Sequence, residues 1–265
     1  MEDGRSGKEM AEVVSLTIAV LIKQVSDMNA IRIDRVSGRI VPSPQLVISS
    51  YDQYAIEAAL RLKEAFGGEV VAVTAGPASA RDAITRALAM GADRGIHLEL
   101  PDVNAADTLG IARLLASALE PLRCKLVIAG QTSDDLEAGQ VGAQVAEFLR
   151  MPVISNVVEF QIEGDEIVAR RDMEDGFQTV RSSLPAVLLS STGLDEPRLP
   201  SLKGIMGAKK KPLESIATSI PLERRITWDD PYVPEKTVTG TIVQDVPAPQ
   251  AAEQLVNWLR EHKLI

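Results

Sequence analysis

One loop of the sequence has residue types that suit nucleotide binding. The stretch GQTSDDLEAGQVGAQVAE, residues 130–147, passes three acidic residues and then enters a predicted helix through residues 139–142. Small residues there let backbone N–H groups approach a phosphate, whose charge the helix dipole favours. The preceding acids could accept hydrogen bonds from ribose hydroxyls or an adenine amine, or they could be ordinary N-terminal caps.

The other chemically interesting residues favour structural roles. His97 lies in a predicted strand and Cys124 directly before one, so both are interpreted as core residues. Glu174 and Asp175 precede a glycine, which favours a solvated turn over a catalytic acid pair. The sequence has no GxGxxG, GxxxxGKS or GxSxG motif, no Ser/His/Asp arrangement and no His/Cys cluster for a metal. We therefore expect no catalytic residue and no metal site.

A second unusual stretch is EPRLPSLKGIMGAKKKP, residues 196–212, which holds Leu202, Ile205 and Met206 among prolines, glycines and lysines. It lacks strand alternation and is short for a helix, so it is expected to remain on the surface. An apolar cluster in such a segment is typical of a transient protein contact, and Lys209–Lys211 would favour an acidic partner. The alternative is that Leu202 folds back onto the chain's own core.

Around these stretches, apolar periodicity predicts alternating strands and helices. Strands are expected at 16–25, 69–76, 93–100 and 125–130, and helices at 52–66, 79–91, 107–122 and 140–149. Ser79 is the predicted N-cap of the second helix. The alternation indicates right-handed βαβ units, and therefore an α/β fold with a parallel-core twisted sheet and helices on both faces. In such sheets ligands bind at the carboxyl ends of the strands.

The remaining segments extend this core. Alternating runs after Pro152 predict antiparallel strands, and a hairpin is expected at 31–41. The C-terminal residues are expected to form a proline-rich extended arm and an amphipathic terminal helix, with Leu255 and Trp258 on its apolar face. We divide the chain into an N-terminal extension (1–15), a nucleotide-binding α/β domain (16–195), a partner recognition loop (196–212) and a C-terminal arm and helix (213–265).

The composition narrows the function class. The chain has 265 residues, 45% of them apolar, which is enough for one large α/β domain or two smaller units. Its formal net charge of -9 argues against binding to nucleic acid or anionic lipid. A single cysteine fits a reducing cytoplasm, and the apolar run at 16–22 is too short to span a membrane. We therefore expect a cytoplasmic protein without direct membrane insertion.

Four stretches, in matching order over about residues 16–215, resemble the beta subunit of electron transfer flavoprotein. They are ALAMGADRGIHLE, the G…DD…GQVG…AE loop, LPAVLLSS and EPRLPSLKGIMGAKKKP. The C-terminal AAEQLVNWLREHKLI is similar to the longer tails of the branch associated with nitrogen fixation and flavin-based electron bifurcation. The resemblance implies an adenine nucleotide alpha hydrolase-like, or Rossmann-like, domain.

It also implies a heterodimer with an alpha subunit that holds the redox FAD, and FAD or AMP in this subunit's own site. The family carries electrons between flavin dehydrogenases, such as the acyl-CoA dehydrogenases of fatty acid oxidation, and an acceptor such as a quinone oxidoreductase. A second FAD would allow NADH-dependent electron bifurcation, whereas AMP would be structural. The C-terminal arm and helix would pack on the alpha subunit.

The resemblance places nucleotide contacts on the loops that the sheet argument selects. They are Leu21, Ser49, Ser50, Tyr51, Asp52, Ala75, Gly130, Gln131, Thr132, Ser133, Asp134, Asp135, Leu136, Glu137, Ala138, Gly139, Gln140 and Val141. The leucine that enters an apolar pocket of partner flavoenzymes matches Leu202, with Ile205 and Met206 as neighbours.

The sequence departs from the family pattern at two places in this site. The family's Asn-Pro-Phe is Ser49–Tyr51 here, and the Asn-Gln-Thr-Gly of AMP-binding members is Gly139–Gly142. The second change favours FAD over AMP. A different class of function, a homodimeric ATP-binding regulator resembling universal stress proteins, would require a glycine-rich GxxG…GS phosphate loop that this sequence lacks.

Overall fold

The computed structural model describes residues 16–34, 36–218, 222, 224–229, 232–233 and 240–265. The strands of the main sheet are β1 (Thr17–Leu21), β6 (Glu69–Gly76), β7 (Arg94–Glu99), β8 (Leu126–Gly130), β9 (Val153–Glu163), β10 (Glu166–Met173), β11 (Gly176–Ser183), β12 (Ala186–Ser190) and β13 (Leu213–Ala217). The α-helices are α1 (Ser50–Phe66), α2 (Arg81–Met90), α3 (Thr108–Leu119), α4 (Val141–Leu149), α5 (Leu202–Ala208) and α6 (Ala248–Glu261). Two short strand pairs stand apart from the sheet: β2 (Gln24–Ser26) with β5 (Leu46–Ile48), and β3 (Arg32–Ile33) with β4 (Ile40–Val41).

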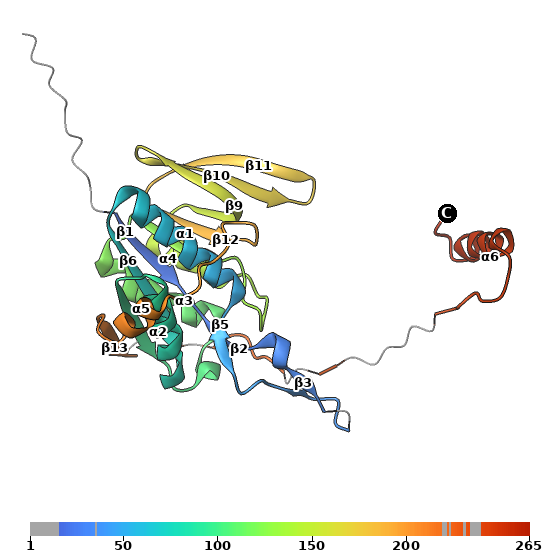
Figure 1. Cartoon of the computed structure of the whole chain (residues 1–265), viewed down its shortest axis with the longest axis horizontal. Helices are drawn as coiled ribbons and strands as arrows, with labels where there is room; N and C mark the ends of the chain where they lie inside the picture. The colour runs from blue at the N-terminus through green and yellow to red at the C-terminus, as the bar shows by residue number, and fades with distance from the viewer. Residues whose placement is uncertain (1–15, 35, 219–221, 223, 230–231, 234–239) are drawn as a thin grey trace, which may run out of the picture.

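The main sheet has the order β11-β10-β9-β12-β8-β1-β6-β7-β13 in the described part of the chain (Figure 1). In this order, each strand from β9 through β12, β8, β1, β6 and β7 to β13 pairs in parallel with the next. At the other edge of the sheet, β10 pairs antiparallel with both β9 and β11. The sheet therefore confirms the predicted fold class. The expected hairpin at 31–41 is also present, as the β3 and β4 pair.

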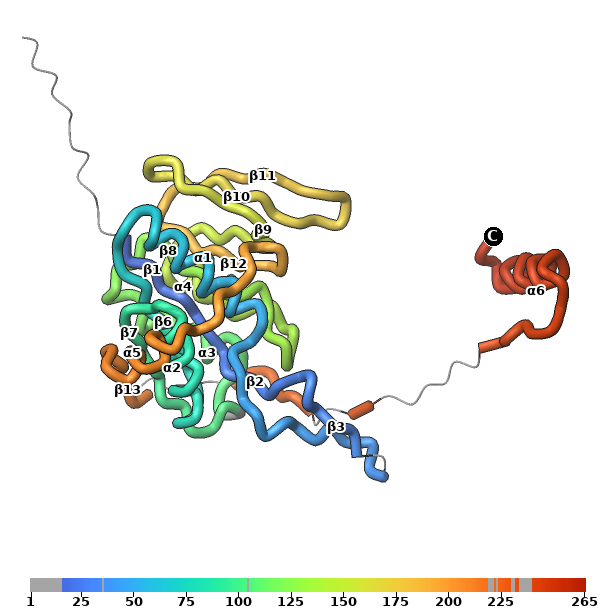
Figure 2. Tube along the Cα trace, viewed as in Figure 1, coloured from blue at the N-terminus to red at the C-terminus, as the bar shows by residue number. Residues whose placement is uncertain are grey.

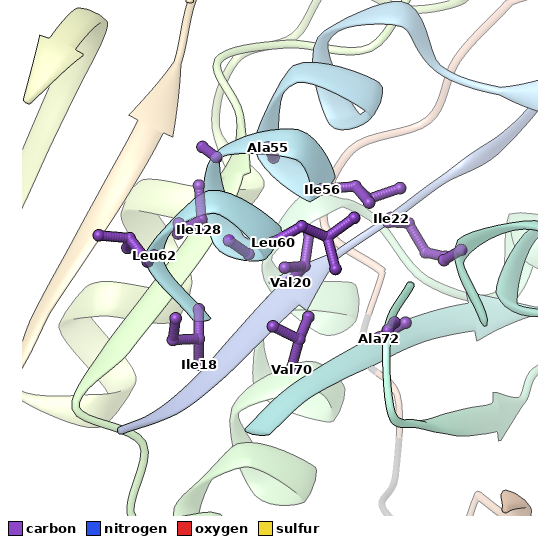
Figure 3. Packing of buried hydrophobic residues seen from close by; sticks show 14 of the residues in the cluster. Ile18, Val20, Ile22, Ala55, Ile56, Leu60, Leu62, Val70, Ala72 and Ile128 are labelled. Atoms are coloured by element: carbon purple, nitrogen blue, oxygen red, sulfur yellow. The ribbon is translucent and has the colours of Figure 1, made fainter. Parts of the chain in front are cut away.

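Alternation along β1 explains why helices cover both faces. Ile18 and Val20 belong to the buried cluster that contains residues of α1 and α2, among them Ile56 (Figure 3). Ala19 and Leu21 belong to a second cluster, with residues of α3 and α4. Successive side chains of a strand point to opposite faces, so one buried strand anchors both helix layers.

Several predicted boundaries differ from the structure. The first strand ends at Leu21 instead of continuing to 25, and β2 pairs with β5 in a separate small sheet. Ser79 is not the N-cap of α2, because it lies in a 3-10 turn (Ala78–Ala80) and the helix begins at Arg81 without a side-chain cap. The helix predicted at 107–122 ends at Leu119 and is followed by a 3-10 turn (Glu120–Leu122).

The segment after β12 is more regular than the sequence suggested. Residues 196–212 were expected to lack a helix, but they contain α5, whose N-cap Ser201 accepts a hydrogen bond from Gly204 N–H. The predicted arm begins as β13, which pairs in parallel with β7. Figure 2 shows α5 and β13 beside α2 at this edge of the sheet. The described part of the chain contains no helix long and apolar enough to cross a membrane.

Candidate functional site

The ends of three neighbouring strands meet at the edge of the sheet where the sequence predicted a ligand. Leu21, Ala75 and Gly130 lie at or next to the last residues of β1, β6 and β8, which are adjacent and parallel. Leu21 is buried in the cluster under α3 and α4, and Ala75 is half-buried beside it. The structure therefore brings these predicted residues to one edge.

Asp52 links two of these strand ends. Its Oδ2 accepts a hydrogen bond from Lys23 N–H at 2.7 Å, and its Oδ1 accepts one from Gly130 N–H at 2.9 Å. Burial raises the pKa of Asp52 to about 7, even though both N–H donors and the Lys23 charge favour the carboxylate. A Cβ atom on Gly130 would lie 2.6 Å from Asp52 Oδ1, so the close approach of α1 to β8 requires glycine.

Asp134 caps the start of α1. Its carboxylate accepts hydrogen bonds from Ser50 N–H at 2.7 Å and from Ser50 Oγ at 2.6 Å, and its own N–H donates to Ser49 Oγ at 3.2 Å. The sequence left open whether the acids of this loop cap a helix. Asp134 does so, but for α1 and not for the helix that follows it.

The exposed part of the loop contains Asp135, Leu136 and Glu137. Asp135 Oδ1 lies 2.7 Å from Lys23 Nζ, which also donates to Ser133 Oγ at 3.4 Å. Both charged side chains are partly exposed, so solvent screens this ion pair. The sequence did not predict Lys23 as a site residue, because Lys23 lies within the strand predicted at 16–25, which ends at Leu21 in the structure.

Gln131 and Thr132 form the inner part of the loop. Gln131 N–H donates to Ser190 O at 2.8 Å, and its side-chain Oε1 accepts from Asn156 N–H at 2.7 Å. The loop is thereby attached to β12 and β9. Thr132 Oγ1 is buried and has no hydrogen-bond partner among the described residues. Buried hydroxyls are normally satisfied, so this atom is suited to bind a polar group of a ligand.

The loop enters α4 next to the start of α3. Gly139 has a φ of +61°, and Gln140 Oε1 accepts a hydrogen bond from Thr108 Oγ1 at 2.8 Å. The Oε1 atom of Gln144 is buried without a partner in the described structure. N–H groups in the first turn of a helix have no acceptor within the helix, so the start of α4 at Val141 offers donors to an anion.

A pocket of about 450 Å³ lies between the starts of these two helices. It is lined by Asp107, Thr108, Leu109, Gly139, Gln140, Ala143, Gln144, Arg225 and Ile226. The Asp107 carboxylate fixes one wall, because it accepts from Gly110 N–H at 3.0 Å and from Arg225 N–H at 2.8 Å. Of these lining residues, the sequence analysis predicted only Gly139 and Gln140 as nucleotide contacts. Asp107 could have been identified as a helix cap, because it is an acid directly before an apolar helical run.

These features fit an adenine nucleotide at the strand edge. The start of α4 offers donors to a phosphate, and Thr132 and Gln144 each have a buried polar atom without a partner among the described residues. The predicted contacts from Ser49 to Asp52 and from Gly130 to Val141 converge there through Asp52 and Asp134. Ala138 lies within the same loop and is half-buried.

The residues interpreted as structural are structural. His97 is fully buried, and its Nε2 lies 2.9 Å from Gly76 O. Burial raises the pKa of the Cys124 thiol to about 11, which makes it unreactive. Glu174 and Asp175 form the turn between β10 and β11. No group of His, Cys, Asp or Glu residues that could hold a metal occurs within the residues that the structure describes.

The apolar residues of α5 point outward. Leu202, Ile205 and Met206 are 75%, 50% and 68% exposed, so the alternative that Leu202 packs onto the core is wrong. Lys211 does not join Lys209 and Lys210 on the surface as expected, because its Nζ donates to Leu88 O at 2.9 Å and Ala92 O at 2.5 Å. Burial also lowers the pKa of Lys211.

Comparison with known proteins agrees with this structure. A family model for the electron transfer flavoprotein domain matches residues 39–221. The chain is 36% identical over 227 residues to the electron transfer flavoprotein subunit beta of Bacillus subtilis (strain 168), covering 83% of this chain and 88% of the relative. It is 35% identical over 249 residues to the subunit beta of Syntrophomonas wolfei, covering 93% and 97%, and 35% identical over 262 residues to that of Sus scrofa, covering 95% and 98%. The chain belongs to the electron transfer flavoprotein family.

Proposed function

We propose that the chain is the beta subunit of a heterodimeric electron transfer flavoprotein, which carries electrons between flavin dehydrogenases and an acceptor such as a quinone oxidoreductase. The observation that supports this role most directly is the exposure of Leu202, Ile205 and Met206 on an ordered helix. A small apolar surface of this kind gives enough affinity for a specific contact and still permits dissociation.

In this proposal the alpha subunit holds the redox FAD, and this chain is its platform. Flavin supplies the electron chemistry when bound, and no residue of this chain makes or breaks a covalent bond. The C-terminal arm and α6 pack on the alpha subunit, because none of the residues of α6 is buried and Leu255 and Trp258 are exposed. A cytoplasmic location is part of the proposal, since the single Cys124 cannot form an internal disulfide.

The strand-edge site is proposed to hold a second nucleotide, FAD in preference to AMP. The start of α4 would bind its phosphate, and Thr132 Oγ1 would bind a polar group. The preference for FAD rests on the form of the Gly139–Gly142 stretch, and a pocket of about 450 Å³ adjoins this loop. With FAD, the complex would carry out NADH-dependent bifurcation; with AMP, it would make simple transfers.

Replacement of Leu202 tests the carrier role. We expect Leu202→Ala to slow electron exchange between the heterodimer and an acyl-CoA dehydrogenase about ten- to thirtyfold, since loss of an interface anchor costs up to roughly 2 kcal/mol. Stopped-flow measurement of flavin reduction would show this, with nucleotide content unchanged. Leu46→Ala, which truncates an exposed leucine on β5, is the matched control. Equal rates for all three proteins would refute the assignment of α5 as the partner surface.

Membership of the electron transfer flavoprotein family favours this role over an ATP-binding regulator. The regulator would purify alone as a stable homodimer without flavin. Co-expression of the chain with an alpha subunit, followed by size-exclusion chromatography, distinguishes the two. A flavin-containing heterodimer supports the proposal.

A further inference from the structure

The segment that leads into α5 is bound to α1 by a network of charged hydrogen bonds. Arg198 Nε and Nη2 donate to the two carboxylate oxygens of Glu57 at 2.8 and 2.9 Å, and Arg198 N–H donates to Glu57 Oε2 at 3.1 Å. The same guanidinium donates to Glu64 Oε1 at 2.5 Å and Oε2 at 3.1 Å. Bidentate Arg–carboxylate pairs combine strength with a fixed geometry.

The network is built around a buried charge. Glu57 is only 2% exposed, and Arg61 Nε also donates to it at 3.0 Å. Burial alone would raise the pKa of Glu57, but the hydrogen bonds from Arg198 and Arg61 hold it below its usual value. A surface loop that needed only a polar exterior would not require a buried carboxylate with this many donors. Removing Arg198 would leave Glu57 with Arg61 as its cation.

The middle and the end of α5 are fixed to α2. A Cβ atom on Gly204 would lie 2.3 Å from Ala89 O, so the two helices touch through their backbones. Ala208 is buried. Beyond the helix, Lys211 Nζ binds the carbonyls of Leu88 and Ala92 at the C-terminal end of α2, where a cation is favoured by the helix dipole.

These attachments matter because α5 has only seven residues. A helix of that length is not stable by itself in water, so its conformation depends on what it packs against. The exposed face therefore keeps its shape only while the flanking attachments hold. Helix order before docking also lowers the entropy lost on binding.

We propose that Arg198, through Glu57 and Glu64, is a positioning residue that holds α5 in its binding conformation before a partner flavoenzyme arrives. Lys211 performs the same role at the other end of the helix. This inference rests on the proposed partner contact at Leu202. It adds that the contact surface is preorganised. Loss of these attachments should therefore weaken partner binding, even though Arg198 and Lys211 act through α1 and α2 of this chain.

Hydrogen exchange and steady-state kinetics together test the proposal, with Arg198→Gln in the intact heterodimer. Amides of α5 are expected to exchange at least tenfold faster than in the wild type. The KM for an acyl-CoA dehydrogenase is expected to rise about fivefold or more, with kcat within twofold and nucleotide content unchanged. Arg198→Lys, which keeps the charge and loses the fork, should lie between the two.

Two further variants keep the result interpretable. Arg181→Gln removes an arginine paired with Glu163 and Glu166 on the antiparallel strands, so it is the matched control and should change neither readout. Lys211→Met removes the contact at the other end of α5, so it should also give faster amide exchange in α5 and a higher KM. It keeps the test available if Arg198→Gln prevents formation of the heterodimer. Unchanged α5 exchange, or faster exchange with an unchanged KM, overturns the inference. If Leu202→Ala does not slow electron exchange, the proposed partner contact itself is wrong. If Leu202→Ala slows electron exchange but Arg198→Gln leaves hydrogen exchange and KM unchanged, only the proposed preorganisation is refuted.

Discussion

At the residue scale, Asp52 shows how a predicted contact acquires a different local role. The resemblance placed it among the nucleotide contacts, and the structure gives both of its oxygens a backbone N–H donor, one from Lys23 just after β1 and one from Gly130 at the end of β8. The buried carboxyl therefore fixes the distance between two strand ends on which a ligand would rest. The Lys23 charge lowers the pKa of Asp52 and the Asp134 charge raises it.

This burial predicts a specific pH dependence of stability. The pKa of Asp52 rises from an ordinary 3.8 to about 7, so the folded state keeps a proton that the unfolded chain releases near pH 4. The contribution of this proton to the free energy of unfolding is therefore complete below pH 4. It is lost as the pH rises to about 7, by at most about 1.4 kcal/mol per pH unit. Asp52→Asn abolishes that dependence and adds a constant cost, because its NH2 group faces one of the two N–H donors.

Thermal unfolding of the heterodimer between pH 5 and 8 would check this. The stability difference between the wild type and Asp52→Asn should shrink as the pH rises. Asp34→Asn serves as control, since hydrogen bonds from Val36 and Ser37 hold the pKa of the exposed Asp34 below its usual value and its charge is constant over this range. Parallel curves for wild type and Asp52→Asn would show that Asp52 titrates normally.

Among the helices, α1 and α3 each begin next to an aspartate side chain that connects the helix to a segment far away in the sequence. Asp134 caps α1 from the nucleotide loop, and Asp107 caps α3 while accepting the N–H groups of Arg225 and Ile226. Hydrogen bonds from Gly110 and Arg225 hold the pKa of Asp107 below its usual range. One side chain thus both starts a helix and closes the wall of the adjoining pocket.

Asp107→Ala should therefore affect two segments at once. Loss of the cap is expected to lower the free energy of unfolding by about 1 kcal/mol, and the amides of Gly110 and Ile226 should both exchange faster. Asp107→Asn is the matched control, because its side-chain oxygen can still cap Gly110. An effect on Gly110 alone would mean that the contact with residues 225 and 226 does not stabilise that segment.

At the scale of the whole molecule, the proposed nucleotide site and α5 lie on different parts of one sheet. The first is formed where β8, β1 and β6 end, and the second packs on α2 next to β7 and β13. A ligand change at the strand edge should therefore leave the α5 surface intact. This separation allows cofactor content and partner binding to be tested independently.

The content of the purified heterodimer decides between the two proposed nucleotides. Two FAD molecules are expected after denaturation, whereas one FAD and one AMP would refute the bifurcating proposal. Thr132→Val, which removes the unpartnered buried hydroxyl and keeps the shape, should lower the nucleotide of this subunit and spare the alpha-bound FAD. Thr85→Val on α2, whose hydroxyl donates to Arg81 O in the preceding turn, is the control. Chromatographic quantification of both nucleotides gives the answer.

Features that depend on neighbouring residues could be predicted from the amino-acid order. Apolar periodicity predicted the βαβ core, glycines marked the ends of α1 and α2, and composition identified residues 196–212 as a surface segment. The strand predicted at 125–130 also placed Gly130 and the loop that follows it at a strand end. These signals arise within a few residues, because strand and helix periods and helix caps are local properties of the chain.

Contacts between residues far apart in the sequence could not be predicted, because they depend on how the whole chain folds. Asp134 caps a helix 84 positions earlier, and Lys211 binds a carbonyl 123 positions earlier, so neither role is visible in its own neighbourhood. The same holds for α5, which is too short to form without α1 and α2. The chain path sets which groups meet and which are buried, and burial in turn sets the pKa of Asp52.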